Sequence, residues 1–191
     1  MSNKKAEAAT YALQFNVAQL LKEATGGTRQ YDVNADIEHA FDEDVVAVSP
    51  LTGQLVFLRT GANILVTGTL EVTLQKACAR CLTDLTLPVT IEIEEIFYPK
   101  MDIVTGNAVE IPEDIEETNL IDDHNIINLF EIVRQEVVLA NDVVLYCRPD
   151  CKGLCQDCGA DLNVETCDCE SKHIDPRWSG LQALATDENE S

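Results

Sequence analysis

Apolar and polar residues alternate along two long stretches in the middle of the chain. From Ile64 to Leu74 the even-numbered positions are mostly apolar, and from Leu85 to Phe97 the odd-numbered positions are. This period of two is typical of strands that bury one face. Only a short connection separates the two stretches, so they predict a long antiparallel hairpin. Pro88 is expected at a sheet edge or a bulge, since it lacks a backbone N–H.

The flanking segments predict shorter elements. Apolar runs between turn residues predict strands at 31–37, 45–48 and 54–59, and a short helix over 17–24. A stripe at helical spacing predicts a helix from Asp122 or Asp123 to about Ala140, with its apolar positions at Ile126, Phe130, Val133 and Val137. Asp175 and Pro176 are typical of a helix start, so a closing helix with Trp178, Leu181 and Leu184 is expected.

These elements predict an α+β fold, in which an antiparallel sheet with a long hairpin and a few helices precedes a C-terminal Cys-rich zinc-binding module. The expected organisation is a flexible N-terminus at 1–12, an α+β domain at 13–146 with an acidic loop at 100–123, a Cys-rich metal module with its closing helix at 147–185, and a disordered tail at 186–191.

Charge narrows the possible partners. The 191 residues carry a net charge of −21, and no Lys or Arg lies between Met101 and Val133. Such a surface repels phosphate backbones and attracts basic proteins, unless a few local cations such as Arg80, Arg148 and Lys152 contact RNA. No segment has the length and composition of a signal peptide or a membrane span, so a cytoplasmic protein without membrane contact is expected.

The cysteines carry the clearest chemistry. The chain has eight, and a reducing compartment favours metal binding over disulfides. Cys155 and Cys158 enclose two residues and precede Gly159, a spacing that brings two thiolates to one point. Four thiolates bind zinc tetrahedrally in closed, structural sites. The segment from Cys147 to Cys169 therefore predicts a structural zinc module.

Eight cysteines divide into two sets of four. The predicted first-ranked site is Cys155, Cys158, Cys167 and Cys169. The predicted second site is Cys78, Cys81, Cys147 and Cys151. Two alternatives stay open: a single zinc in the C-terminal cluster, or a redox role for the Cys78–Cys81 pair. Native mass spectrometry distinguishes one zinc from two.

Catalytic motifs are absent from the sequence. There is no phosphate-binding loop, dinucleotide fingerprint, zinc-protease motif or nucleophile elbow. Paired acids such as Glu94–Glu95 are typical of solvated faces. No catalytic or organic-cofactor residues are predicted, and the protein is not expected to be an enzyme.

Four segments together resemble the YceD-like family of large ribosomal RNA subunit accumulation proteins over roughly residues 13–185. They are RTGANILVTGTLEVTLQKACARCL, VVLANDVVLYC, CRPDCKGLCQDCGADLN with the later CDCE, and DPRWSGLQAL. The resemblance implies a role in accumulation, processing or assembly of large-subunit rRNA. It carries the family's cysteine motifs onto all eight cysteines, whereas metal ligation is a chemical inference. Trp178 stands where an aliphatic residue is expected.

The preferred function is therefore a non-catalytic ribosome-biogenesis factor with one or two structural Zn²⁺ ions. Its expected partners are large-subunit precursor particles, through basic ribosomal proteins, precursor rRNA or both. The alternatives are a direct RNA-binding zinc protein, in which a zinc knuckle grips single strands, and a CxxC redox protein. The oligomeric state stays open.

Overall fold

The chain forms two compact units that interleave in sequence. A computed structural model describes residues 9–38, 40–41, 45–169 and 177. The first unit contains the described residues up to Ala77 together with Asp84–Leu145, and the second contains Cys78–Thr83 with the described residues from Tyr146 onward. The chain therefore passes between the units three times.

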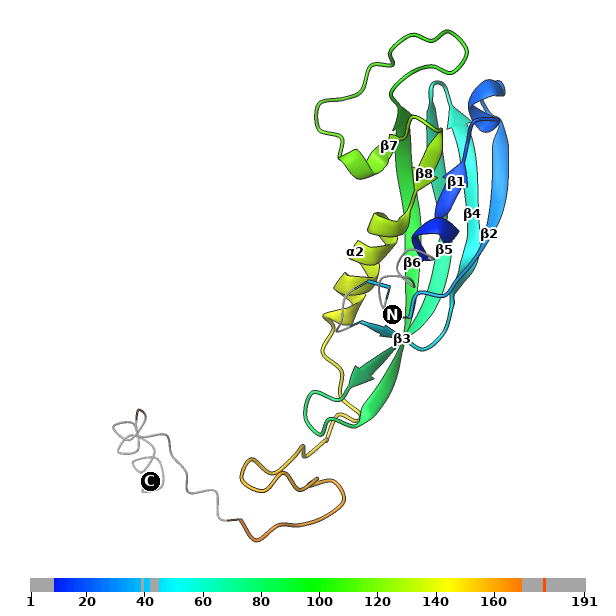
Figure 1. Cartoon of the computed structure of the whole chain (residues 1–191). Helices are drawn as coiled ribbons and strands as arrows, with labels where there is room; N and C mark the ends of the chain where they lie inside the picture. The colour runs from blue at the N-terminus through cyan, green and yellow to red at the C-terminus, as the bar shows by residue number, and fades with distance from the viewer. Residues whose placement is uncertain (1–8, 39, 42–44, 170–176, 178–191) are drawn as a thin grey trace, which may run out of the picture. The chain divides into compact units, whose positions relative to one another are not determined.

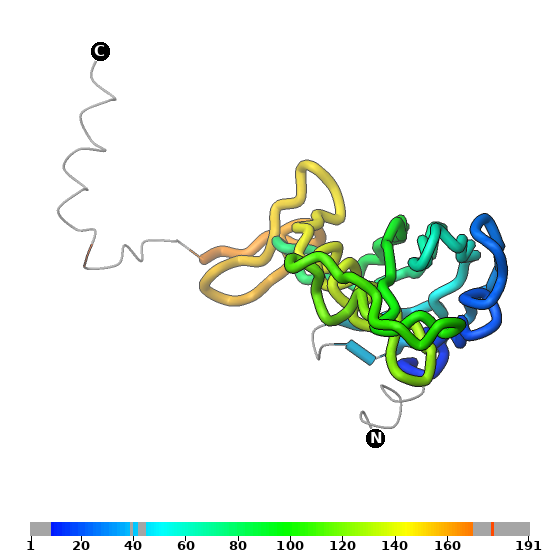
Figure 2. Tube along the Cα trace, turned by 90° about the horizontal axis from the view of Figure 1, so that it is seen from above, coloured from blue at the N-terminus to red at the C-terminus, as the bar shows by residue number. Residues whose placement is uncertain are grey.

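A six-stranded sheet forms the body of the first unit (Figure 1). Its strands are β2 (Thr28–Ala35), β3 (Val46–Ala47), β4 (Leu51–Thr60), β5 (Asn63–Ala77), β6 (Asp84–Pro99) and β7 (Leu120–Ile121). The order across the sheet is β2-β4-β5-β6-β7, with β3 beside β5. Figure 2 shows the strands from above, in colour order from blue β2 through cyan β4 to green β6.

The predicted hairpin is confirmed. β5 and β6 pair antiparallel from Ile64 opposite Phe97 to Ala77 opposite Asp84. Their alternate side chains are buried, among them Leu70 and Ile91. The strands exclude water on one face because the sequence keeps a period of two over the whole pairing. Pro88 lies opposite Thr73 within β6 and is exposed.

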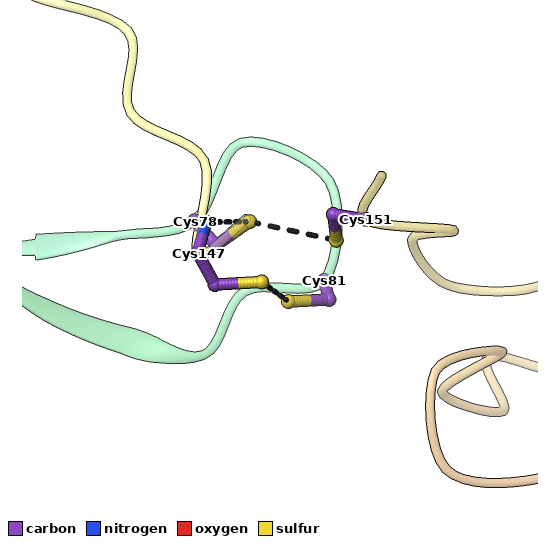
Figure 3. Close-up of side chains that lie close together, drawn as sticks. All are labelled: Cys78, Cys81, Cys147 and Cys151. Carbon is purple, nitrogen blue, oxygen red and sulfur yellow. Dashed lines mark hydrogen bonds between the residues drawn. The ribbon is translucent and has the colours of Figure 1, made fainter. Parts of the chain in front are cut away.

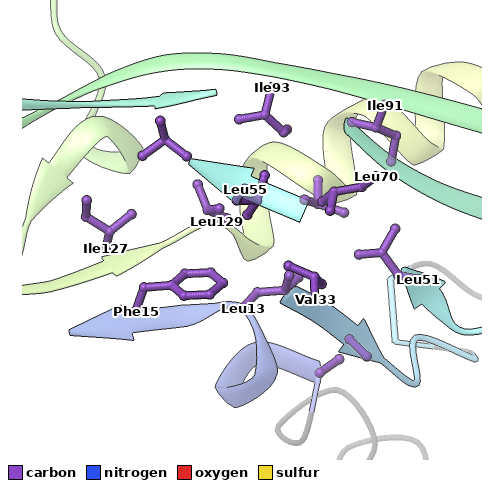
Figure 4. Packing of buried hydrophobic residues seen from close by; sticks show 14 of the residues in the cluster. Leu13, Phe15, Val33, Leu51, Leu55, Leu70, Ile91, Ile93, Ile127 and Leu129 are labelled. Atoms are coloured by element: carbon purple, nitrogen blue, oxygen red, sulfur yellow. The ribbon is translucent and has the colours of Figure 1, made fainter. Parts of the chain in front are cut away.

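A smaller layer covers the buried face of this sheet. β1 (Gln14–Asn16) pairs antiparallel with β8 (Ile126–Asn128), and α2 (Phe130–Asn141) follows directly. The first unit also contains two 3-10 turns, η1 (Leu20–Lys22) and η2 (Glu117–Asn119). Buried side chains from both layers, including Leu13, Leu55 and Leu129, meet in one largely aliphatic core (Figure 4).

The predicted helix over 122–140 is wrong in its first half. The Asp122 carboxylate accepts hydrogen bonds from the backbone N–H groups of His124 (2.9 Å) and Ile126 (2.7 Å), and Asn125 has a left-handed φ of 61°. This local turn competes with the helix, as Asp and Asn side chains commonly do. The residues after it pair with β1, and the helix begins only at Phe130. Val133 and Val137 are buried, as the stripe predicts.

Two other expectations have different outcomes. The segment 17–24 contains only the single turn η1, although Leu20 and Leu21 are buried as expected. The acidic segment after Pro99 carries η2 and β7, and β7 pairs parallel with the end of β6. The closing helix at Trp178, Leu181 and Leu184, and the tail at 186–191, lie outside the described residues. The fold class, a predominantly antiparallel sheet with few helices and C-terminal cysteine clusters, is confirmed.

Candidate metal centres

The eight cysteines gather into two groups of four, both inside the second unit. The first tetrad is Cys78, Cys81, Cys147 and Cys151, and the second tetrad is Cys155, Cys158, Cys167 and Cys169. All eight are free thiols. These are the same two sets that the sequence predicts, and metal ligation by them stays a prediction.

The spacing of the sulfurs suits a tetrahedral metal ion. Within each tetrad all four Sγ atoms lie within 4.8 Å of one another. Figure 3 shows the first tetrad, in which the Sγ atoms of Cys78 and Cys151 are 3.9 Å apart and those of Cys81 and Cys147 are 3.6 Å apart. Zinc with four Zn–S bonds of about 2.3 Å places its sulfurs roughly 3.8 Å apart. The donor set therefore fits a closed, four-thiolate site.

The two C-x2-C turns have the same backbone hydrogen bonds. In the first, Leu82 N–H donates to the Cys78 carbonyl (2.9 Å) and Cys78 N–H donates to the Thr83 carbonyl (2.9 Å). In the second, Gly159 N–H donates to the Cys155 carbonyl (2.9 Å) and Cys155 N–H to the Ala160 carbonyl (2.8 Å). Each turn thus presents two sulfurs in the same way.

One residue distinguishes the two turns. The residue after the second cysteine is left-handed in both, with φ of 77° at Gly159 and 59° at Leu82. Glycine adopts this region without a steric penalty, whereas a leucine there is strained. The residue types alone do not reveal that the two turns are equivalent, because the position of Gly159 in the second turn is occupied by Leu82 in the first.

Backbone N–H groups favour the thiolate of the first cysteine in each turn. Hydrogen bonds from the N–H groups of Cys81, Arg80 and Cys147, against an opposing effect of burial, lower the pKa of Cys78 to about 6. Those of Cys158 and Asp157 lower the pKa of Cys155 to about 7. Hydrogen bonding to a charged form stabilises that form. Each C-x2-C turn therefore holds a thiol that ionises readily.

The pKa of Cys151 is also lowered, because the effect of burial is outweighed by hydrogen bonds from the Asn163 side chain and the Gly153 N–H. Two other thiols oppose ionisation. Burial, then the neighbouring thiols, raises the pKa of Cys147 to about 12. The Cys158 thiol, then burial, raises the pKa of Cys169 to about 12. Four thiolates this close repel one another unless a cation lies between them. A divalent metal supplies that charge, so the electrostatics also suit a metal site.

Asn163 links the loops around the first tetrad, and sequence reasoning missed it. Its Nδ2 donates to the Cys151 sulfur (3.4 Å), while its Oδ1 accepts from Lys152 N–H (2.8 Å) and from the Arg148 guanidinium (2.7 Å). Such contacts orient metal ligands. Asn163 is the last residue of the CGADLN segment, but asparagine has many roles in loops, so its residue type alone does not identify this one.

Arg80 and Arg148, near the cysteines, have partners within the second unit. The Arg80 guanidinium donates to the Cys151 carbonyl (3.0 Å) and lies over the Tyr146 ring, 4.6 Å from its centroid. Arg148 contacts Asp150 (3.7 Å) as well as Asn163. Leu154 N–H donates to the Arg80 carbonyl (3.1 Å), next to Gly153 with its φ of 75°. Both arginines therefore support the fold of the cysteine loops.

These features define a class of protein, a sheet-based scaffold that carries two four-cysteine clusters. The family model described as "Large ribosomal RNA subunit accumulation protein YceD" matches residues 66–185, which is more than half of the chain. The chain belongs to this family, so the resemblance found in its motifs is confirmed. The family description names no catalytic activity.

Curated relatives share only part of their length with the chain. An uncharacterized protein of Mycobacterium bovis is 34% identical over 130 residues, which is 68% of this chain and 59% of the relative. A Mycobacterium leprae protein is 28% identical over 141 residues, 70% of this chain and 58% of the relative. Bacillus subtilis YlbN is 27% identical over 116 residues, which is 60% of this chain and 62% of the relative. The chain thus spans about three fifths of these relatives.

No solved structure is significantly similar to the chain. Among the described residues, no helix has the length and apolar character needed to cross a membrane.

Proposed function

We propose that the chain is a non-catalytic factor for accumulation and assembly of large-subunit rRNA, and that its second unit is a structural zinc module. The family match carries the ribosomal part of this proposal. The two cysteine tetrads carry the zinc part, with Cys78, Cys81, Cys147 and Cys151 holding one ion and Cys155, Cys158, Cys167 and Cys169 the other. Eight free thiols suit a reducing compartment, and we place this role in the cytoplasm.

Zinc in these sites is structural. A closed set of four thiolates leaves no position for water or substrate, so the ion crosslinks loops. The described residues of the second unit include few buried apolar side chains, and metal binding adds folding free energy to this small core. The Cys78–Cys81 pair lies against Cys147 and Cys151, which favours ligation over an independent redox role.

Protein contacts are favoured over direct RNA contacts. The net charge of −21 repels phosphates, and the guanidinium groups of Arg80 and Arg148 have intramolecular partners. Basic ribosomal proteins on a precursor particle are the complementary partners. The protein therefore joins the particle through its proteins, with RNA contact secondary.

A complementation experiment tests the biological role. Cells that lack their own copy receive the wild-type chain, Cys147→Ser, or the control Val164→Ser, which changes an exposed residue outside both tetrads. We expect wild type and the control to restore the ratio of large- to small-subunit rRNA, and Cys147→Ser to fail. A normal ratio in cells without any copy contradicts the ribosomal role.

A pull-down tests the type of contact. Tagged protein is recovered from lysate with and without nuclease, and co-purified ribosomal proteins are quantified. Their retention after RNA digestion is expected. If all of them disappear with the RNA, the protein-contact proposal is wrong.

A further inference from the structure

The outer edge of β6 lacks a partner strand over most of its length. β5 pairs with one side from Asp84 to Phe97, whereas β7 on the other side pairs only with Tyr98 and Pro99. Within the described part of the chain no other strand lies on that side. An open strand edge presents unpaired N–H and C=O groups to solvent and can accept another strand.

The register identifies which residues present these groups. The Ile96 carbonyl accepts a hydrogen bond from Asn119 (3.3 Å), which approaches from the β7 side, so Ile96 directs its backbone away from β5. Orientation alternates along an antiparallel strand, so Thr90, Glu92 and Glu94 do the same. Pro88 also falls in this series. Its missing N–H would have pointed to the open edge, which explains why β6 accommodates a proline.

A hollow adjoins this edge. It has a volume of about 480 Å³ and lies between the end of β6, the segment before β7 and one side of α2. Figure 1 shows α2 alongside β6, and β7 beside the C-terminal end of β6. Asn119 holds the segment in place through the Glu95 carboxylate (2.8 Å) and the Ile96 carbonyl. Ile115 and Ile132 contribute apolar surface.

Charge determines which strand fits. Five carboxylates line the hollow, from Glu94, Glu95, Asp114, Glu116 and Glu136, and its described lining contains no Lys, Arg or His. A second copy of β6 is a poor partner, because it would bring Glu92 and Glu94 of one copy against those of the other. Charged side chains on an edge strand prevent self-pairing in this way. A strand bearing Lys or Arg is attracted instead.

We infer that the β6 edge and its adjoining hollow bind an extended, Lys/Arg-rich peptide segment, which adds to the sheet as a strand. The peptide backbone pairs with Thr90–Glu94. Alternate peptide side chains project to opposite faces of the sheet. Cations on one face meet Glu92 and Glu94. Side chains on the other face enter the hollow, where Ile115 and Ile132 offer apolar contact and Glu95 and Glu136 attract further cations. The inference needs neither zinc nor RNA, and it gives the protein contacts of the proposed function a location.

Binding is measured with a synthetic probe. A fluorescent peptide of about ten residues that alternates Lys and Val is titrated with the full-length protein, and anisotropy gives the Kd. Its comparison peptides are one that alternates Glu and Val, and a Lys–Val peptide with an N-methyl group on every backbone amide. We expect binding by the first peptide alone. Equal binding of the N-methylated peptide overturns strand addition, since N-methylation removes the donors that pairing requires.

Matched variants locate the site. Glu94→Lys is compared with Glu110→Lys, which changes net charge equally at an exposed residue outside the hollow. Thr90→Pro removes an edge N–H, and Thr86→Pro makes the same change beyond Pro88. We expect Glu94→Lys and Thr90→Pro to weaken binding about tenfold and the controls to leave it unchanged. Equal losses in both members of each pair overturn the inference, and circular dichroism verifies folding.

Two further outcomes separate this inference from the proposed function. If the peptide fails to bind but ribosomal proteins still co-purify after nuclease treatment, the β6 edge is wrong and the proposed function stands. If a single-stranded RNA of similar length binds in preference to the Lys–Val peptide, the edge is not a basic-peptide site.

Discussion

Exchanging the residues after the two C-x2-C turns should change zinc affinity in opposite directions. Gly159→Ala introduces a side chain at φ 77°, and an added Cβ at Gly159 meets no atom within 4 Å, so its effect is confined to the backbone. A left-handed conformation costs an L-residue about 1–2 kcal/mol. The zinc affinity of the second tetrad should therefore fall by about fivefold to thirtyfold.

The reverse substitution relieves the same strain. Leu82 has a φ of 59° and is 64% exposed, so Leu82→Gly removes strain and little packing. The gain is reduced by about 0.5–1 kcal/mol, because glycine has more freedom in the unfolded chain. A net gain of up to about 1.5 kcal/mol remains, which strengthens zinc binding at the first tetrad by up to about twelvefold.

The assay is competition for zinc against a chromophoric chelator at fixed pH. Each variant changes one site, so the other serves as an internal reference. Unchanged affinity in Gly159→Ala, or weaker affinity in Leu82→Gly, would refute the argument that the two turns are equivalent. A Leu82→Gly protein that binds zinc better but fails to restore rRNA levels would show that the exposed Leu82 side chain contacts a partner.

Three other predictions follow from the same geometry. Native mass spectrometry should find two zinc ions in the wild-type chain and one each in Cys147→Ser and Cys158→Ser, and a single ion in wild type would contradict the two-site assignment. In metal-stripped protein at pH 8, Cys155 should alkylate before Cys169, because the lowered pKa of about 7 leaves Cys155 mostly thiolate while the pKa of about 12 keeps Cys169 protonated; peptide mapping after limited iodoacetamide treatment reads the order, and the rate at Cys155 should fall as the pH drops below 7 while the order stays the same. Gly53→Ala should lower the free energy of unfolding by about 1–3 kcal/mol in a urea titration, because its Cβ would lie 2.1 Å from the Thr69 carbonyl and 2.9 Å from the Leu70 Cα on the neighbouring strand, whereas Gly61→Ala has open space and should show only the effect of its left-handed φ.

The hairpin was predictable because one signal runs unbroken over its whole length. Each strand keeps its own period of two, over Ile64–Leu74 in β5 and over Leu85–Phe97 in β6. The apolar residues over 122–140 follow helical spacing equally clearly. This spacing, however, carries no information about local hydrogen bonds from side chains to the backbone. Asp122 satisfies two backbone N–H groups and redirects the chain, which frees Ile126–Asn128 to pair with β1.

Strands of two or three residues are too short to be predicted from the periodicity of apolar positions. β7 has two residues and β8 three, so neither spans enough positions to show a pattern. Their placement depends on long-range pairing, such as Tyr98 with Leu120. The grouping of the cysteines was predictable by counting, because eight ligands make two complete sets. The contributions of Asn163 and of the left-handed Leu82 required coordinates, because neither residue type is diagnostic by itself.

The positions of the cysteines along the chain determine when each tetrad can be completed during synthesis. The second tetrad comes from one continuous segment, and its two pairs are separated by the short stretch between Cys158 and Cys167. The first tetrad joins cysteines 66 positions apart, with β6, β7, β8 and α2 encoded between Cys81 and Cys147. Closing the longer loop costs about 2 kcal/mol more. During synthesis the first tetrad cannot be complete until the ribosome has translated residue 151, after every strand of the first unit. A metal ion bound at the first tetrad would therefore indicate a chain in which all strands of the sheet have already been synthesised.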